Sequence, residues 1–138
     1  MKRQIIFRGK CDPQSKFAGQ WVHGGCVQCE NGVTLIYSAQ SDTCTLLCHV
    51  IGDTVGQFTG LQDIKGKDIY EGDIVRMKTI TGGTYFIAYE DSHIGAFSLC
   101  NPNGHFAGIF GRDADFEPFY CEVIGNIHDN PEFLKIEN

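Results

Sequence analysis

Residues 54–75 read Thr54-Val55-Gly56-Gln57-Phe58-Thr59-Gly60-Leu61-Gln62-Asp63-Ile64-Lys65-Gly66-Lys67-Asp68-Ile69-Tyr70-Glu71-Gly72-Asp73-Ile74-Val75. Glycines recur in this segment among aromatic and β-branched residues. Glycine suits tight turns, whereas β-branched and aromatic residues favour strands. The segment therefore predicts short strands joined by tight turns, and it contains no catalytic motif.

Its glycines are predicted to occupy structural turns at Gly56, Gly60, Gly66 and Gly72. Gly66 closes a hairpin loop that begins at Asp63, where positive φ is needed, and Gly72 marks a second reversal of the chain. Apolar pairs precede and follow Gly72, so this turn would bring two strands together. We interpret the segment as a joint between two β portions. Gly72→Val should unfold the protein, whereas Asp63→Asn and Glu71→Gln should leave it folded.

The composition is that of a β-rich globular protein. The chain has 138 residues, of which 42% are hydrophobic, 12% aromatic and 20% charged. A chain of this length forms one domain by default, and its apolar content excludes disorder. We expect a single domain over residues 1–138, with a subdivision into an N-terminal β portion, 1–53, and a C-terminal β portion, 54–138.

Apolar runs on both sides of residues 54–75 predict further strands, at residues 5–8, 33–37, 43–51, 74–80, 84–89, 96–100 and 119–127. Residues 105–119 have no clear period, so no element is predicted there. The Asn130-Pro131-Glu132 sequence has the form of a helix start, which predicts one helical turn over residues 131–136. Short strands separated by turns predict a mainly β fold, a barrel or a sandwich.

The apolar run after Met1-Lys2-Arg3-Gln4 is too short for a signal peptide. No stretch reaches the length of a membrane span. We therefore expect a cytoplasmic protein that does not engage a membrane. Its cysteines are expected to be reduced.

Two cysteine pairs, Cys26-x-x-Cys29 and Cys44-x-x-x-Cys48, have spacings close to those of a structural zinc site. Zinc would need the sulfurs of each pair within about 4 Å of each other. If residues 43–51 form a strand, Cys44 and Cys48 lie roughly 13 Å apart. They share a strand face with Leu46, as buried cysteines acting as small hydrophobes do. We predict no metal and no cofactor.

The candidate catalytic groups have structural explanations. Cys48 and His49 are neighbours in a predicted strand, so their side chains point to opposite faces. Asp63, Glu71 and Asp73 could gather with Asp68 to bind a cation or transfer protons. Aspartate is, however, common in turns for conformational reasons. We predict no catalytic residue and expect that the protein is not an enzyme.

A basic patch near Tyr70 would suit a nucleic acid bound to a small barrel. Its members are Lys65, Lys67, Arg76 and Lys78. The net charge of −6 opposes affinity driven by phosphate contacts. The lone tryptophan is interpreted first as a core anchor and second as a binding platform. The candidate binding residues are Trp21, Asp63, Lys65, Lys67, Tyr70, Glu71 and Asp73.

Several segments together carry a family resemblance. The densest part comprises Thr54-Val55-Gly56-Gln57-Phe58-Thr59-Gly60-Leu61, Asp63, Gly66-Lys67 and Ile69-Tyr70-Glu71-Gly72-Asp73-Ile74-Val75. The outlying parts are Phe7-Arg8-Gly9, Trp21 with Gly24, Glu122-Val123-Ile124-Gly125-Asn126-Ile127 and Asn130-Pro131-Glu132. This pattern resembles the signature of the YopX family of phage and prophage proteins. Residues 26–48 and 105–116 lie outside that pattern.

The resemblance implies a β-rich fold with an SH3-like small barrel in the C-terminal part, in a bacterial host. It implies no particular activity. Because the candidate catalytic groups have structural explanations, we expect a phage accessory protein that is a non-enzymatic protein-interaction or structural module. Its expected partner is another protein or further copies of the chain, and the alternative is a nucleic-acid-binding small β-barrel.

Overall fold

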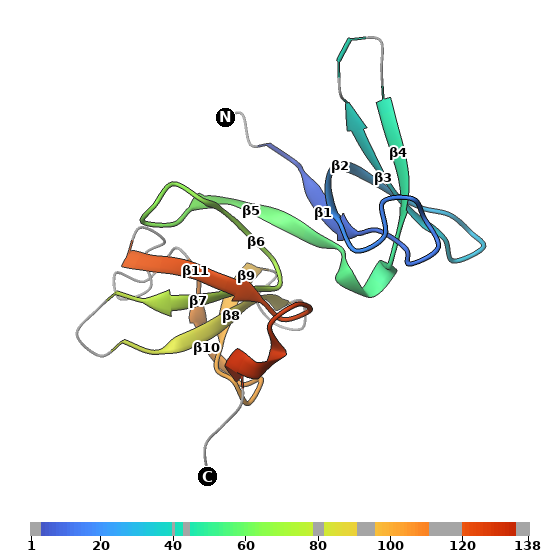
Figure 1. Ribbon diagram of the computed structural model, residues 1–138. Helices are drawn as coiled ribbons and strands as arrows, with labels where there is room; N and C mark the ends of the chain where they lie inside the picture. The colour runs from blue at the N-terminus through green and yellow to red at the C-terminus, as the bar shows by residue number, and fades with distance from the viewer. Residues whose placement is uncertain are drawn as a thin grey trace. The chain divides into compact units, whose positions relative to one another are not determined.

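The computed structural model describes residues 4–39, 41–42, 45–78, 82–90, 96–110 and 120–134. These residues form β-strands, turns and short 3₁₀ helices (Figure 1). The chain divides into two compact units, Met1–Phe58 and Thr59–Asn138. Among the described residues, no helix is long and apolar enough to cross a membrane.

The N-terminal unit is an antiparallel sheet. Its strands are β1 (Phe7–Lys10), β2 (Trp21–Gln28), β3 (Thr34–Ala39) and β4 (Thr45–Val50), followed by the 3₁₀ helix η1 (Gly52–Thr54) and the start of β5 (Gly56–Gln62). The strands lie in the order β4-β3-β2-β1-β5, and the sheet continues through β5 to β6. The turn at Asn31-Gly32 joins β2 to β3, with Gly32 at φ 88°, and Asn-Gly is a common hairpin turn.

Strand β2 bends sharply at Gly24 and pairs with a different strand on each side of the bend. Its first half pairs with β1, and its second half pairs with β3 from Gly25 onward. Gly24 has φ 155°, and a Cβ there would collide with the backbone carbonyl of Tyr37. Strand β2 lies where the sequence predicts no strand, because the glycines at the bend break up the strand pattern.

The core of this unit lies on one face of β3 and β4. Its buried apolar residues are Cys11, Ile36, Cys48 and Val50. Leu46 packs against this cluster from the same face of β4, in agreement with the alternation predicted for residues 43–51. Cys44, predicted on that face too, lies outside the described residues.

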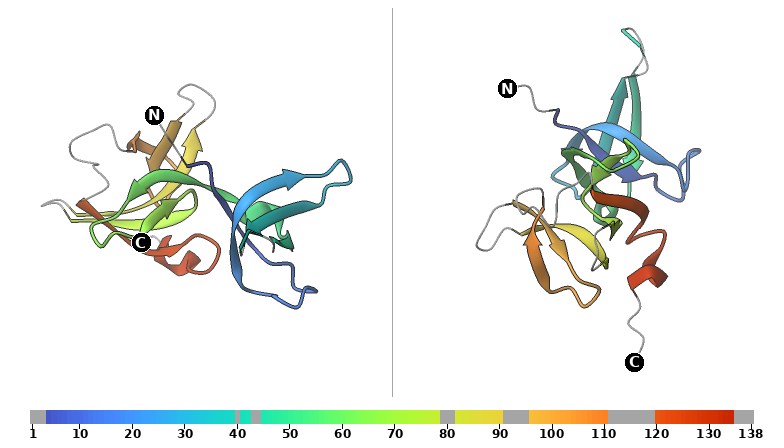
Figure 2. Two further views of the ribbon diagram at one scale, coloured as in Figure 1. Left: turned by 90° about the horizontal axis from the view of Figure 1, so that it is seen from above. Right: turned by 90° about the vertical axis from the view of Figure 1, so that its left-hand side faces the viewer.

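The C-terminal unit contains a second antiparallel sheet, in the order β10-β9-β8-β7-β11 (Figure 2). Its strands are β7 (Asp73–Met77), β8 (Thr84–Glu90), β9 (Ala96–Cys100), β10 (Phe106–Ile109) and β11 (Cys121–Asn126). Strand β6 (Asp68–Tyr70) adjoins β5 in the other sheet, and the 3₁₀ helix η4 (Pro131–Leu134) follows β11. The buried core contains Ile69, Val75, Met77, Ile87, Leu99, Phe110, Cys121 and Val123.

The mainly β prediction is confirmed, whereas the predicted closed barrel is wrong for the described residues. They form two open antiparallel sheets, and no pairing joins β10 to β11. Repeated short strands and turns do not distinguish open sheets from closed ones. Strand β10 was also not predicted, because its pairing with β9 shifts register between Phe106 and Gly108 and hides the alternation.

The predicted turns at Gly66 and Gly72 are present, with φ of 81° and 93°. Gly56, however, begins β5, and Gly60 lies inside β5 with φ 88°. Gly60 thus marks an irregularity inside a strand, and in the sequence such a glycine is hard to tell from a turn glycine. The helical turn predicted from residue 131 is the 3₁₀ helix η4, and residues 135–136 of that prediction lie outside the described residues.

Candidate functional site

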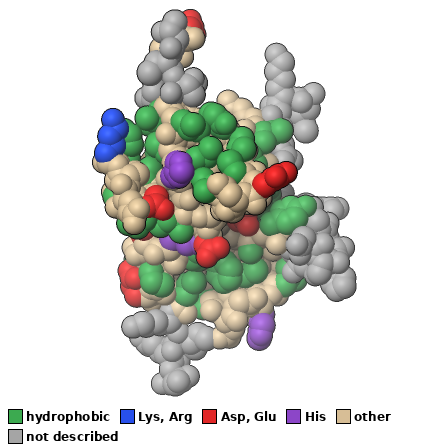
Figure 3. All heavy atoms as spheres, turned by 90° about the vertical axis from the view of Figure 1, so that its right-hand side faces the viewer, with side chains coloured by type: hydrophobic (Ala, Val, Ile, Leu, Met, Phe, Trp, Pro, Cys, Tyr) green, Lys and Arg blue, Asp and Glu red, His purple; other side chains and the backbone are tan. Residues whose placement is uncertain are grey.

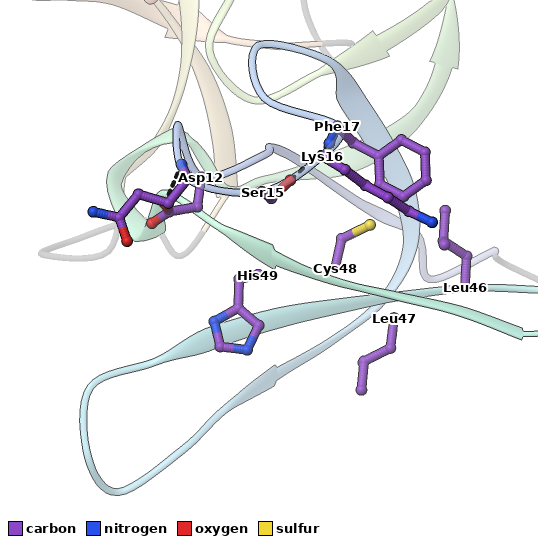
Figure 4. Close-up of a pocket in the computed structure, with 9 residues that line it drawn as sticks. Asp12, Ser15, Lys16, Phe17, Leu46, Leu47, Cys48 and His49 are labelled. Carbon is purple, nitrogen blue, oxygen red and sulfur yellow. Dashed lines mark hydrogen bonds between the residues drawn. The ribbon is translucent and has the colours of Figure 1, made fainter.

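A pocket of about 570 Å³ lies in the N-terminal unit between the turn at residues 12–17 and strand β4 (Figure 4). Pockets of about 300–1,000 Å³ are typical ligand sites. Its lining residues are Asp12, Gln14, Ser15, Lys16, Phe17, Leu46, Leu47, Cys48 and His49. Figure 4 shows Leu46 and Cys48 on the same side of β4 as Phe17, whereas Leu47 and His49 point to the other side. The floor is therefore apolar and the rim polar.

Local hydrogen bonds fix the turn that forms one wall. The Gln14 N–H donates to Asp12 Oδ1 (2.8 Å), and the Phe17 N–H donates to Ser15 Oγ (2.9 Å). The Ser15 N–H also donates to the Asp12 carbonyl (2.9 Å). Aspartate and serine stabilise turns in this way. The Lys16 ammonium lies 5.1 Å from the centre of the Phe17 ring, so the rim cation and the apolar wall are adjacent.

The other wall is the outer edge of β4, which is the terminal strand in the sheet order. An isolated bridge joins the end of this edge, at Val50, to Cys11. The Asp12 N–H donates to the His49 carbonyl (3.0 Å), so the backbone of His49 points away from β3. Residues two apart in a strand orient their backbone alike, so the N–H and C=O of Leu47 also point away from β3. Within the described part of the chain, no strand pairs with this edge at Leu47.

At Leu47, the part of the edge that the 12–17 segment leaves open, the sequence lacks the features that usually protect an exposed strand. Charged side chains, prolines and bulges are the common protections. The β4 sequence Thr45-Leu46-Leu47-Cys48-His49-Val50 contains no proline, aspartate, glutamate, lysine or arginine. Its pairing with β3 is regular from Thr34 to Ala39. The edge is therefore free to accept another strand.

The Cys48 thiol of the pocket floor and the neighbouring Cys11 thiol, which does not line the pocket, are poorly suited to nucleophilic catalysis. Cys11 and Cys48 are both buried. Burial, together with the neighbouring Cys48 thiol, raises the pKa of Cys11 to about 11. A thiol with this pKa is protonated at neutral pH, and the thiolate is the nucleophile. His49 lies on the opposite face of β4 from Cys48, as predicted, so it cannot act as that thiol's base.

The opposite face of β2, β3 and β4 exposes apolar side chains. Tyr37 lies directly across from Leu47, and Leu35 lies between Val27 and His49. Val27 is 40% exposed, Tyr37 39% and Leu47 50%. We call Val27, Leu35, Tyr37 and Leu47 the apolar face. Figure 3 views the molecule from the right-hand side of Figure 1, where these strands are drawn, and hydrophobic side chains gather on that side. Exposed apolar patches commonly mark interaction sites.

The chain matches the family model described as YopX protein over residues 15–135. The chain belongs to the YopX family. The resemblance noted in the sequence is thus confirmed.

A solved structure has a similar fold. The crystal structure of protein EF1440 from Enterococcus faecalis matches this YopX family member with a TM-score of 0.53 and 19% sequence identity. The match covers 97% of this chain and 100% of that chain. Comparison with curated protein sequences gives no match. The likeness to EF1440 therefore concerns the fold alone.

The YopX signature residues around Asp63 build a loop in the C-terminal unit. Asp63 is 5% exposed, and its Oδ1 accepts hydrogen bonds from the N–H groups of Lys65 and Lys67, both 2.9 Å. Its Oδ2 accepts a bond from the Val123 N–H in β11 (2.9 Å). Burial alone would raise the pKa of Asp63, but these backbone hydrogen bonds outweigh burial and lower it. The carboxylate thus holds the loop against β11.

The turn between β6 and β7 contains the next candidates. Asp73 is 1% exposed, and its Oδ2 accepts a hydrogen bond from the Tyr70 N–H (2.8 Å). Tyr70 is buried, and Glu71 is half-buried. Tyr70 and Asp73 thus meet across the turn in a structural hydrogen bond, and neither lines the pocket.

Two of the four lysines and arginines in the predicted basic patch are already paired with a carboxylate, so they are less able to bind a phosphate group. Lys65 and Lys78 both form ion pairs with Glu122, at 2.8 and 2.9 Å. Hydrogen bonds from Lys65 and then Lys78 lower the pKa of Glu122 to about 2, and the same carboxylate raises the pKa of Lys65. Lys67 and Arg76 are exposed. The predicted basic patch is therefore partly neutralised by an acidic residue of β11.

Trp21, the remaining candidate, begins β2 in the N-terminal unit and is half-buried. The Arg8 guanidinium lies 4.9 Å from the centre of its ring. This distance suits a cation–π contact between neighbouring strands. Trp21 does not line the pocket.

Two of the four metal candidates are separated by a core residue. Ile36 pairs with Cys26 on one side and with Cys48 on the other, so it stands between these cysteines. Cys29 follows β2, and Cys44 lies outside the described residues. Among the residues described, no group of three or more His, Cys, Asp or Glu side chains is arranged to hold a metal ion.

Among the lining residues, the sequence pattern singles out only Leu46, Cys48 and His49, and it does not indicate a pocket. The walls come from segments about thirty residues apart, and neither has a motif of known chemistry. Two signals were present: Asp12-Pro13, which is typical of a turn, and the uncharged run from Thr45 to Val50.

Proposed function

We propose that this YopX family member is a non-enzymatic protein-interaction module. The observation that carries the proposal is the free, uncharged edge of β4 beside a pocket with an apolar floor. An extended segment can add to such an edge through backbone hydrogen bonds, while neighbouring pockets accept its alternate side chains. The apolar face on the same strands adds surface that association would bury.

The hydrogen bonds of the central segment support a structural role for Asp63 and Asp73. Asp63 and Asp73 are buried and accept backbone hydrogen bonds. Their carboxylates therefore stabilise the conformation of the loops that contain them. A general acid or base must instead reach the proton that it transfers. We therefore place the binding site in the N-terminal unit and give the central segment a structural role.

We also propose that the protein is a phage or prophage accessory protein acting in the bacterial cytoplasm, which rests on the family membership. We further propose that the five-stranded sheet is the SH3-like part. Strands β7, β8, β9 and β10 follow one another across this sheet, and β11 returns to pair with β7. This order is that of SH3-type domains, and it supports the assignment.

The test is a pull-down with the tagged full-length protein, in a host under prophage induction, together with a second copy carrying another tag. Leu47→Pro removes only the outward N–H of the β4 edge, a position where sheets tolerate proline. Leu47→Val is the matched control, because it keeps that N–H and an apolar side chain. We expect a captured protein that is lost with Leu47→Pro and retained with Leu47→Val.

A gel shift with single- and double-stranded DNA and RNA tests the alternative. Binding that weakens steeply with salt and is lost on Lys67→Glu with Arg76→Glu would indicate nucleic-acid recognition. That result, without any capture that depends on Leu47, would overturn the proposed function.

A further inference from the structure

We propose that the β4 edge pairs with the β4 edge of a second copy of this chain, antiparallel, about a two-fold axis at Leu47. The inference rests on the proposed function and names the partner of the same site. A two-fold interface uses the same surface on both copies, so it requires an edge that is complementary to itself.

The backbone of β4 meets that requirement. The N–H and C=O of Leu47 both point away from β3, and neither is paired with another strand in the described chain. Antiparallel partners that exchange hydrogen bonds donate one N–H and accept one through one C=O. Leu47 and Leu47 of the partner subunit would therefore form a complete pair.

Other two-fold registers fit less well. An axis at Cys48 would put His49 into both central hydrogen-bonded pairs, but its carbonyl already accepts the hydrogen bond from the Asp12 N–H. With the axis at Leu47, the central pair does not involve His49. The turn at residues 12–17 also closes the edge beyond His49. The register centred on Leu47 uses the open part of the strand.

Side chains on the pocket side support the same register. Residues directly opposite in an antiparallel pair share a face. Pairing at Leu47 thus places the partner subunit's Leu46 opposite Cys48, beside the pocket whose apolar wall is Phe17. Each copy would give a leucine to the other copy's pocket and receive one in return. On the opposite face, the half-exposed Leu47 would contact the partner's Leu47.

Charge does not oppose the pairing. Like charges directly opposite each other destabilise a sheet, and β4 carries no carboxylate, lysine or arginine. The chain's net charge of −6 resides elsewhere. A short strand pair buries less than the area of standard stable interfaces, so we expect a dimer that forms and dissociates with concentration.

The test uses the full chain with opposite charges placed at the axis. Wild-type protein should move from its monomer mass of 15.3 kDa toward twice that mass as concentration rises, measured by sedimentation equilibrium. Leu47→Lys and Leu47→Glu should each remain monomeric, because like charges would meet across the axis. An equimolar mixture of the two variants should recover the dimer, because opposite charges then meet.

Val27→Lys and Val27→Glu are the matched controls. Val27 is also an exposed residue of the apolar face, but it lies on β2, away from the β4 edge. These variants should dimerise as wild type does, and circular dichroism should show that every variant is folded. If a Leu47 charge variant does not fold, Leu47→Pro serves instead and should be monomeric.

A wild-type chain that stays monomeric up to its solubility limit would overturn the inference, as would a dimer unaffected by the Leu47 changes. Failure of the mixture to dimerise would overturn the two-fold register. A monomeric wild type with Leu47-dependent capture of a different protein would retain the proposed function and reject only the second copy as its partner.

Discussion

At the scale of single residues, Asp63 illustrates how a conspicuous carboxylate can serve architecture. Three backbone N–H groups donate to it, and one of them belongs to β11, sixty residues further along the chain. The sequence correctly suggested a turn at this position. It could not reveal the bond to Val123, because that contact depends on tertiary structure.

We predict that Asp63→Asn destabilises the protein by about 1–3 kcal/mol while leaving it folded, because the amide NH₂ must face at least one backbone N–H donor. Asp68→Asn is the control, since Asp68 is exposed and its carboxylate bonds only the Gln62 amide among the contacts described. Urea unfolding measures both. Equal losses for the two variants would contradict the role assigned to Asp63.

The pH dependence of the same variant has a definite sign. The pKa of Asp63 is lower in the folded protein than its ordinary value of about 3.9, so its stabilisation is present above that value. It is lost as pH falls through the folded pKa. The wild type should therefore lose more free energy of unfolding than Asp63→Asn between pH 5 and pH 3. Glu122 forms an ion pair near the surface, so we expect it to contribute little to the pH dependence of the free energy of unfolding.

At the scale of elements, the turn between β6 and β7 depends on Gly72. Gly72 has φ 93°, its N–H donates to the Ile87 carbonyl (2.8 Å), and its carbonyl accepts from the Ile127 N–H (2.9 Å). A β-branched residue is strained at this φ and would disturb both hydrogen bonds.

We predict that Gly72→Val abolishes cooperative folding of the C-terminal unit or costs at least about 2–3 kcal/mol. Gly25→Val is the control, because Gly25 has no positive φ and open space where a Cβ would lie. Thermal unfolding followed by circular dichroism compares them. A Gly72→Val protein as stable as the control would refute the turn assignment.

The sequence predicts the regular strands, and it misses the strands that contain a backbone irregularity. Strands with unbroken alternation, such as β3, β4, β7 and β8, were found from their patterns. Strand β2 bends at Gly24 and exchanges one neighbour for another, and β10 contains an irregular register. In both cases backbone irregularity removed the period-two signal on which strand prediction depends.

At the scale of the whole molecule, two compact units each have their own apolar core. The boundary between them, after Phe58, falls inside the segment most characteristic of the family. The sequence predicts a joint over residues 54–75, with a division after residue 53. The pocket lies in the N-terminal unit instead, and only folding brings its walls together.

The central claim is that the free edge of β4 is the binding edge, and amide hydrogen exchange at Leu47 in the wild-type chain tests it most directly. The Cys48 amide is the internal control, because it points toward β3 and should be protected at every concentration. We predict that the Leu47 amide exchanges rapidly in dilute protein and becomes protected as the dimer forms. A Leu47 amide that exchanges equally fast in monomer and dimer would contradict the account.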